Sequence, residues 1–258
     1  MKRFENKVAV VTGASRGIGQ SILLAFAREG AHVVGIGVSD YTETAEKVRA
    51  LGAKFTQIGA DFSTLTQAGA TGIVGQVIRE AGRADVLVNN SGIIRRAPAV
   101  EYSAKDWNEV LQVNLTAPFF LCQAFAKWWL EGGREQSAPE DRLRIVNIAS
   151  VLSFQGGILV PAYTASKSGI AGVTKALACE WAKERINVNA IAPGYIATEN
   201  TRPLREDETR NAAILSRIPE SRWGSPEDIA GSCLFLSSPD ADYMNGTIMN
   251  VDGGWLAR

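Results

Sequence analysis

Tyr163 and Lys167 are four residues apart at the start of an apolar segment of helical character. Residues at i and i+4 share one face of a helix, so we expect the phenol and the ammonium to lie side by side. A nearby cation favours the phenolate, and the pKa of Tyr163 is therefore expected to fall from its ordinary value of about 10 toward the range in which it exchanges a proton with an alcohol or carbonyl oxygen. A solvated helix face is the simpler interpretation of the pair on its own.

Two further polar side chains could complete such acid–base chemistry. Ser150 follows the apolar run 144–149, thirteen residues before Tyr163, and a strand end at that distance can face the start of the helix. Its hydroxyl could hydrogen-bond a substrate oxygen, whereas a turn or cap is the plainer alternative. Asn114 lies inside an apolar helical stretch, where its amide requires buried partners or is simply a satisfied core amide.

Residues 7–19 predict a buried strand, a glycine-rich turn and the start of a helix that continues from Gln20 to Gly30. Glycines at 13, 17 and 19 allow the backbone to approach a diphosphate closely. The amino terminus of the helix adds unpaired N–H groups and a favourable dipole for that anion. The spacing is G-x-x-x-G-x-G, and a simple chain reversal is the alternative interpretation.

Strand-like runs alternate with helical runs along the chain, at 8–11, 32–37, 54–59, 86–89, 144–148, 187–191 and 247–251. This alternation predicts an α/β fold, a doubly wound parallel sheet with helices on both faces. A length of 258 residues suits one such domain over residues 1–258. The polar segment 131–142 is expected to be an exposed loop.

Charge and composition argue against several classes of partner. The chain has 27 basic and 27 acidic residues, so nothing favours nucleic acid or an anionic membrane. Cys122, Cys179 and Cys233 are interpreted as small core residues of a reducing compartment. No apolar run of membrane-spanning or signal-peptide length is seen, which predicts a cytoplasmic protein. With one histidine, His32, and no C-x-x-C, no catalytic metal is expected.

Two more motifs follow strand-like runs in the order that a known family shows. They are Asn89-Asn90-Ser91-Gly92 and the segment 193–198, which begins Pro-Gly. With the glycine turn and the four polar groups above, they resemble the short-chain dehydrogenase/reductase family over nearly the whole chain. Ser91 departs from the alanine usual there, and serine is small enough to keep the turn.

The resemblance implies a role for each polar group. Tyr163 would be the general acid/base, Lys167 would lower its pKa and hold the nicotinamide ribose, Ser150 would orient the substrate, and Asn114 would support a proton-relay water. A dinucleotide-sensing protein without turnover is the non-enzymatic alternative. Such proteins usually lack one of these groups, and all four are present here.

The resemblance also implies the cofactor contacts. They would come from Gly13, Ser15, Arg16, Gly17, Ile18, Gly19, Gly37, Ser39, Asp61, Phe62, Asn90, Ser91, Gly92, Tyr163, Lys167, Pro193, Gly194, Ile196 and Thr198. NAD(H) is the cofactor that the resemblance suggests. The position that usually carries an acidic residue for NAD is Gly37, however, and Arg16 would welcome a 2′-phosphate. Asp40 could repel that phosphate, so the residues permit NADP(H) without requiring it.

The segments 93–96, 150–157, 196–201 and 251–258 go beyond the general signature and are similar to those of the family's 2-dehydro-3-deoxy-D-gluconate 5-dehydrogenases, which act in uronate breakdown. A sugar-acid substrate would need a partner for its carboxylate, and an arginine could supply a bidentate contact. The expected substrate residues are Arg95, Arg96, Ser150, Gln155, Tyr163 and Arg202. The arginines could instead lie in solvent or at a subunit contact.

Alternative activities share the same chemical groups. They are 4-deoxy-L-erythro-5-hexoseulose uronate reductase, gluconate 5-dehydrogenase and 3-ketoacyl reductase, the last of which would want a more apolar entrance. The family's mobile substrate lid corresponds to about 194–218. A homotetramer is expected by resemblance, and the ending 255–258 would expose apolar surface as a free tail.

Overall fold

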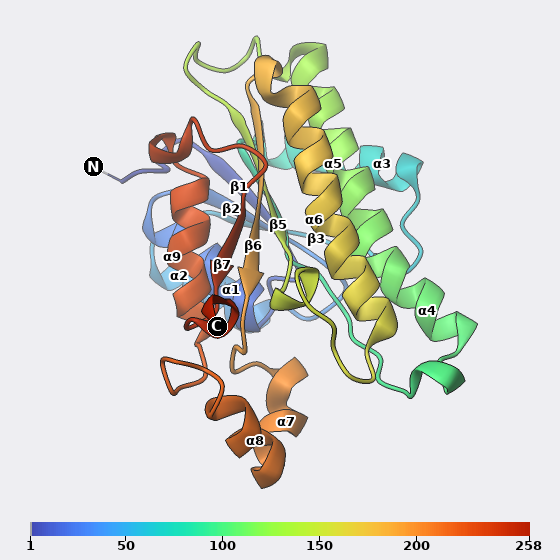
Figure 1. Ribbon diagram of the computed structural model, residues 1–258. Helices are drawn as coiled ribbons and strands as arrows, with labels where there is room; N and C mark the ends of the chain where they lie inside the picture. The colour runs from blue at the N-terminus through green and yellow to red at the C-terminus, as the bar shows by residue number, and fades with distance from the viewer. Residues whose placement is uncertain (1) are drawn as a thin grey trace.

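One sheet of parallel strands forms the centre of the computed structural model, which describes residues 2–258 (Figure 1). Its order is β3-β2-β1-β4-β5-β6-β7, and every pairing is parallel. The strands are β1 Val8–Thr12, β2 His32–Ile36, β3 Phe55–Ile58, β4 Val86–Asn89, β5 Leu143–Ile148, β6 Ile186–Pro193 and β7 Ile248–Val251. All seven predicted runs are therefore strands, close to their expected bounds.

Helices cover both faces of the sheet, as predicted (Figure 1). One face carries α1 Gly17–Arg28, α2 Thr42–Ala50 and α9 Pro226–Leu236. The other carries α3 Gln67–Ala81, α4 Ala104–Leu111, α5 Ala117–Trp128 and α6 Pro161–Trp181. Neighbouring strand residues point to opposite faces, so Val10 packs into the layer of α3 and α5 whereas Val11 packs into the layer of α1 and α9. This explains why β1, β5 and β6 are buried along their whole length.

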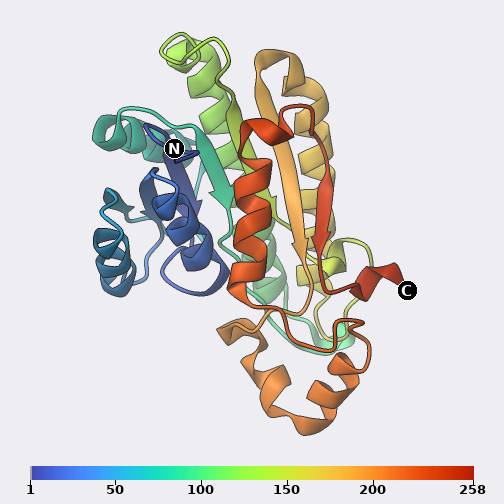
Figure 2. The same ribbon diagram turned by 90° about the vertical axis from the view of Figure 1, so that its left-hand side faces the viewer.

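The strand order reverses direction between β1 and β4. Chain connections leave these two strands toward opposite faces, which opens a crevice beyond their carboxyl ends, the usual ligand position in such sheets. Two short helices, α7 Arg202–Glu206 and α8 Glu208–Leu215, project beyond the same end of the sheet (Figures 1 and 2). They fall within the segment 194–218 that was expected to be the lid.

Two expectations need correction. Cys179 is exposed, because it lies on the outer side of α6, whereas Cys122 and Cys233 are buried as predicted. The segment 131–142 is only partly a free loop. Its first residues complete a π-helical turn, Trp129–Gly133, and Asp141 near its end pairs with Arg83 at 2.9 Å and with Lys7.

Two features are absent from residues 2–258, a membrane-spanning helix and a cluster of metal-ligating side chains. No helix there is both long and apolar enough to cross a bilayer. Nor does that part of the chain hold a cluster of three or more His, Cys, Asp or Glu side chains arranged around a metal position.

Candidate active site

Tyr163 and Lys167 lie on one face of the first turns of α6. Pro161 at the first position of the helix fixes the φ angle that a helix requires and has no N–H to leave unpaired. The Lys167 Nζ is 5.6 Å from the centre of the Tyr163 ring and donates to the Ile148 carbonyl, at the end of β5, at 2.5 Å. The predicted pairing on one helix face is thus present, and Lys167 is buried.

Burial has the largest effect on the pKa of both Lys167 and Tyr163. It lowers the pKa of Lys167 to about 8 and raises the pKa of Tyr163 above its ordinary value. A hydrogen bond with the Ser150 hydroxyl and the positive charge of Arg96 both lower the pKa of Tyr163, but less than burial raises it. The expected fall in the Tyr163 pKa is therefore wrong for this structure, in which the Lys167 ammonium bonds the Ile148 carbonyl.

Ser150 follows β5 directly and faces the start of α6, as its spacing predicted. Its Oγ accepts a hydrogen bond from the Leu152 amide at 3.2 Å and so caps the short helix Val151–Ser153. The same hydroxyl is close enough to the Tyr163 phenol to lower its pKa. Ser150 is therefore both a cap and a neighbour of the reactive oxygen, so the two interpretations of this residue are compatible.

Asn114 lies in a π-helical segment, Gln112–Thr116, between α4 and α5. Such bulges interrupt helices frequently at functional sites. Its Oδ1 accepts from the Ile93 amide at 2.8 Å, while its Nδ2 donates to the Ile93 carbonyl at 2.9 Å and to the Ser166 hydroxyl at 3.2 Å. The buried amide thereby fixes the loop after β4 against α6.

The glycine turn has the conformation that its sequence predicted. Gly13 and Gly17 have φ angles of 64° and 58°, which side chains disfavour. A Cβ on Gly19 would lie 2.4 Å from both the Gly13 carbonyl oxygen and the Asn90 Nδ2, so only glycine fits. The Asn90 amide donates to the carbonyls of Thr12 at 2.9 Å and Gly13 at 3.1 Å, which joins this turn to the end of β4.

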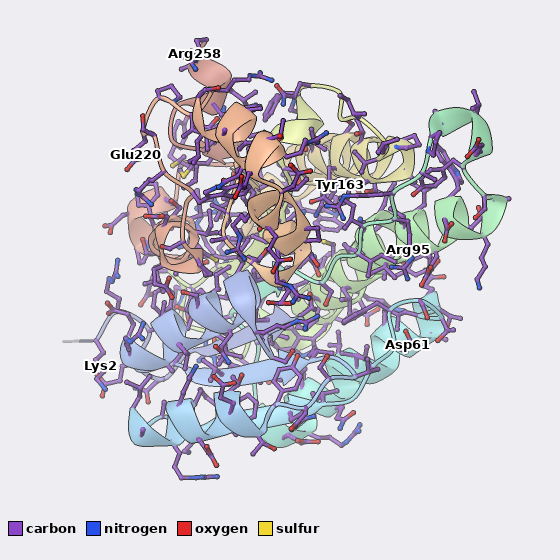
Figure 3. All side chains as sticks on the ribbon, turned by 90° about the horizontal axis from the view of Figure 1, so that it is seen from below. Lys2, Asp61, Arg95, Tyr163, Glu220 and Arg258 are labelled. Atoms are coloured by element: carbon purple, nitrogen blue, oxygen red, sulfur yellow. The ribbon has the colours of Figure 1, made fainter. Side chains whose placement is uncertain are left out.

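A cleft of about 640 Å³ lies between the glycine turn, the end of β4, α6 and the segment before α7. Figure 3 views the molecule from this end, with Tyr163 and Arg95 labelled. Most residues that were predicted to hold a cofactor line it: Gly13, Ser15, Arg16, Gly17, Ile18, Gly19, Gly37, Ser39, Asp61, Phe62, Asn90, Ser91, Gly92, Tyr163, Lys167 and Thr198. The glycine turn and the Tyr163–Lys167 pair thus share one cavity.

Three predicted cofactor residues lie behind the cleft wall. Pro193 ends β6, and Ile196 is buried in the apolar layer of α1 and α9. A Cβ on Gly194 would come within 2.7 Å of the Asp252 backbone, so this glycine permits close packing of the chain near its end. These residues support the segment that leads to Thr198 instead of lining the cavity.

Comparison with known proteins identifies the family. Residues 13–256 match the family described as enoyl-(acyl carrier protein) reductase. The chain is 51% identical to the 2-dehydro-3-deoxy-D-gluconate 5-dehydrogenase of Escherichia coli (strain K12) over 254 residues, 98% of this chain and 97% of that protein. The chain belongs to the short-chain dehydrogenase/reductase family. The resemblance deduced from the motifs is thereby confirmed.

Solved structures agree with this family assignment. A crystal structure of a candidate 2-deoxy-D-gluconate 3-dehydrogenase from Agrobacterium tumefaciens with bound NADP is 50% identical, with a TM-score of 0.87 and complete coverage of both chains. A gluconate 5-dehydrogenase from Burkholderia cenocepacia J2315, in complex with NADP and tartrate, is 31% identical, with a TM-score of 0.91 and coverage of 100% of this chain and 98% of that one.

The end of β2 carries no carboxylate that lines the cleft. A Cβ on Gly37 would lie 3.0 Å from the hydroxyl of Tyr41, a buried residue whose role the sequence did not reveal. The Tyr41 Oη donates to the Ile36 carbonyl at 2.9 Å and accepts from the Ala14 amide at 3.0 Å. Asp40 is engaged by the amide and hydroxyl of Thr42, at 2.9 and 2.7 Å. Burial raises the pKa of Tyr41 to about 12, so it remains a phenol.

Asp61 follows β3 and is one of the predicted cofactor residues. It lines the cleft. It also accepts a hydrogen bond from the Ser63 amide at 2.8 Å and so forms a turn, and this bonding lowers the pKa of the carboxyl.

The two adjacent arginines after the Asn-Asn-Ser-Gly turn have different surroundings. Arg95 makes a two-pronged contact with Glu109, at 3.2 and 2.9 Å, and lies 3.8 Å from Asp106. Arg96 has no carboxylate within 4.0 Å among residues 2–258. It donates to the Asn200 carbonyl at 3.2 Å, and its charge acts on the Tyr163 phenol. Arg96, and not Arg95, is therefore the arginine whose charge lowers the pKa of Tyr163.

Of the predicted substrate residues, Tyr163 lines the cleft, whereas Arg95, Arg96, Ser150, Gln155 and Arg202 do not. Gln155 is half-buried in the turn after the helix that Ser150 caps. Arg202 is exposed and pairs with Glu199 at 3.3 Å. Arg205, one turn further along α7, does line the cleft, and its Nη2 donates to the Thr198 carbonyl at 3.1 Å. The sequence analysis missed Arg205, because two arginines on one short helix differ only in their packing.

Proposed function

We propose that this NAD(P)-dependent oxidoreductase interconverts a ketone and a secondary alcohol of a keto-deoxy sugar acid, as a 2-dehydro-3-deoxy-D-gluconate 5-dehydrogenase does. The observation that carries the proposal is the single cleft that the glycine turn shares with Tyr163 and Lys167. Four relatives with that name, at 46–51% identity over 98% of this chain, support the substrate class. The acyl substrate in the description of the matched family has no comparable support among these relatives.

We propose NADP(H) as the preferred cofactor. The residues fit it, because Gly13, Gly17 and Gly19 leave room for a diphosphate beside the amino terminus of α1. At the end of β2, Gly37 offers no acid, Arg16 lines the cleft, and Asp40 does not line it, so a 2′-phosphate at this end of the cleft meets a cation and no carboxylate of this strand end. When bound, the nicotinamide supplies or accepts the hydride.

The chain's own residues move the proton. Burial keeps Tyr163 a phenol at neutral pH, so its Oη can donate a proton to a substrate carbonyl oxygen. We propose that the Ser150 hydroxyl donates to the same oxygen and orients it. Lys167 would hold the nicotinamide ribose and stabilise the phenolate that forms. Asn114 fixes Ile93 and Ser166, and we propose that it also supports a proton-relay water.

Arg96 is our candidate for the substrate carboxylate. Among residues 2–258 it has no acidic partner, it bonds only a lid carbonyl, that of Asn200, and its charge reaches the Tyr163 phenol. A carboxylate near the reacting ketone would find a planar donor there. Arg95 is engaged by Glu109 and is better interpreted as fixing α4 to this loop.

We also propose that the segment 194–218 closes over the substrate, and that the protein is a cytoplasmic homotetramer. The exposed apolar side chains of Phe154 and Ile158 are consistent with a subunit contact near the cleft. The carboxy-terminal segment gives less support than expected, because Trp255 is buried against Ile214 and Ile218 of the same chain. Light scattering of the purified protein tests the tetramer.

The function is tested with a panel of keto acids and acyl thioesters, each assayed with NADPH and with NADH. We expect the highest kcat/KM for a six-carbon keto-deoxy acid with NADPH. Preference for a 3-ketoacyl thioester would contradict the proposed substrate class, and preference for NADH would contradict the proposed cofactor. Preference for 5-ketogluconate would favour the gluconate 5-dehydrogenases, one of which is 38% identical over 95% of this chain.

A further inference from the structure

Arg205 and Arg202, the two arginines of α7, differ in their exposure and in their partners. Arg202 is exposed and paired with Glu199 at 3.3 Å. Arg205 lines the cleft, and its buried Nε has no hydrogen-bond partner in the described part of the chain. No carboxylate of residues 2–258 lies within 4.0 Å of its guanidinium, whose one protein bond goes to the Thr198 carbonyl. Arg205 is half-buried, and a guanidinium whose Nε is buried without a partner is favourably placed to bind an anion.

The position of Arg205 indicates which anion that partner is. The Thr198 Cγ2 lies 3.7 Å from where a Cβ on Gly17 would be, so Thr198 lies against the glycine turn where the two sides of the cleft meet. Arg205 holds the carbonyl of this same residue. Its guanidinium is therefore near the amino terminus of α1, on the opposite wall of the cavity. A group bound between the two walls would meet backbone N–H donors on one side and a guanidinium on the other.

We propose that Arg205 is a cofactor-binding residue, which contacts the diphosphate of the dinucleotide from the lid segment. This inference rests on the proposed function, because it requires a dinucleotide in the cleft. Arg205 and Arg96 then bind different anions, the diphosphate and the substrate carboxylate. Arg205 serves the cofactor beside the glycine turn, and Arg96 serves the substrate carboxylate beside Tyr163. Each arginine bonds a carbonyl of the same short segment, Thr198 and Asn200 respectively, so binding either anion also positions the lid.

The test compares Arg205→Ala with Arg202→Ala, its matched control on the same helix, in the full-length protein. Dissociation constants are measured by fluorescence titration for NADPH and by competition for adenosine 2′-monophosphate, which lacks the diphosphate. We expect Arg205→Ala to weaken NADPH binding by about 10- to 100-fold, the usual loss for a charge-assisted contact, and to leave adenosine 2′-monophosphate unchanged. Arg202→Ala should change neither. Arg205→Lys should restore part of the affinity, because lysine keeps the positive charge but lacks the planar guanidinium with its paired N–H donors.

Each other outcome overturns the inference. An NADPH dissociation constant within twofold of wild type in Arg205→Ala would mean that the arginine does not bind the cofactor. Equal weakening of both nucleotides, or a lowered melting temperature of Arg205→Ala and Arg205→Lys alike, would assign it a structural role. A change confined to the KM of the keto acid would assign it to the substrate carboxylate. Failure of the wild-type protein to bind either NADPH or NADH would instead refute the proposed function itself.

Discussion

The buried hydroxyl of Tyr41 gives the account a quantitative prediction. Tyr41→Phe removes the oxygen that donates to the Ile36 carbonyl and accepts from the Ala14 amide, at 2.9 and 3.0 Å. The side chain is 1% exposed, so water cannot replace these bonds. The Ile36 carbonyl keeps its bond from the Gly13 amide, at 2.8 Å, so the Ala14 amide is the group left unpaired. Leaving one buried polar group unpaired costs about 1–3 kcal/mol. At this chain length we expect the melting temperature to fall by about 2–12 °C.

The same change should loosen the glycine turn, because the Ala14 amide is part of it. NADPH should therefore bind more weakly to Tyr41→Phe even well below the melting temperature. The matched control is Tyr243→Phe, which removes a fully exposed hydroxyl and should leave both quantities unchanged. Calorimetry and a nucleotide titration provide the two readouts. A melting temperature for Tyr41→Phe within 1 °C of that for Tyr243→Phe would refute the reasoning.

Three more predictions concern single side chains. Arg96→Ala should lower kcat/KM for a keto acid by about 30- to 1000-fold but hardly affect kcat/KM for the corresponding amide. The control Arg202→Ala should leave both values at the wild-type level. Equal losses on acid and amide in Arg96→Ala would contradict a carboxylate contact. Iodoacetamide should alkylate exposed Cys179 in the native protein and spare Cys122 and Cys233, whose pKa values burial raises to about 12; mass spectrometry shows which cysteines react. Between pH 8 and 10 the unfolded chain binds a proton that folded Lys167 lacks, because burial lowers its pKa from 10.5 to about 8. Lys167 therefore adds a positive contribution to the slope of the unfolding free energy against pH in this window, and the slope should be less positive in Lys167→Met than in the wild type; equal slopes would refute this.

Backbone features of the site could be predicted from the sequence because they depend on local chemistry. Apolar runs gave the strands, and Gly13, Gly17 and Gly19 had to be glycine because of positive φ angles or contacts below 3 Å. The position of Ser150 opposite Tyr163 also followed, since a strand end and the next helix start meet at the same edge of a parallel sheet. Each of these depends on residues that are close in sequence or on the topology of the fold.

Features that depend on distant partners could not be predicted. Arg95 and Arg96 are adjacent, but only the packing of α4 brings Glu109 to Arg95 and leaves Arg96 beside the phenol. The burial of Tyr41 in the otherwise polar segment 38–47 arises from the room left by Gly35 and Gly37 on the neighbouring strand end. The pKa of Tyr163 was expected to fall, because the spacing showed the nearby cation but not the burial that outweighs it.

The central claim is that Tyr163 exchanges a proton with a keto-deoxy sugar acid in the cleft that holds the nucleotide. The most direct measurement is the NADPH-dependent reduction of that acid by wild type and Tyr163→Phe, with the NADPH dissociation constant of each. We predict steady turnover by the wild type, a loss of several orders of magnitude in kcat in the variant, and an unchanged dissociation constant, since only the transferable proton is removed. A variant that keeps more than about a tenth of wild-type turnover would contradict the claim.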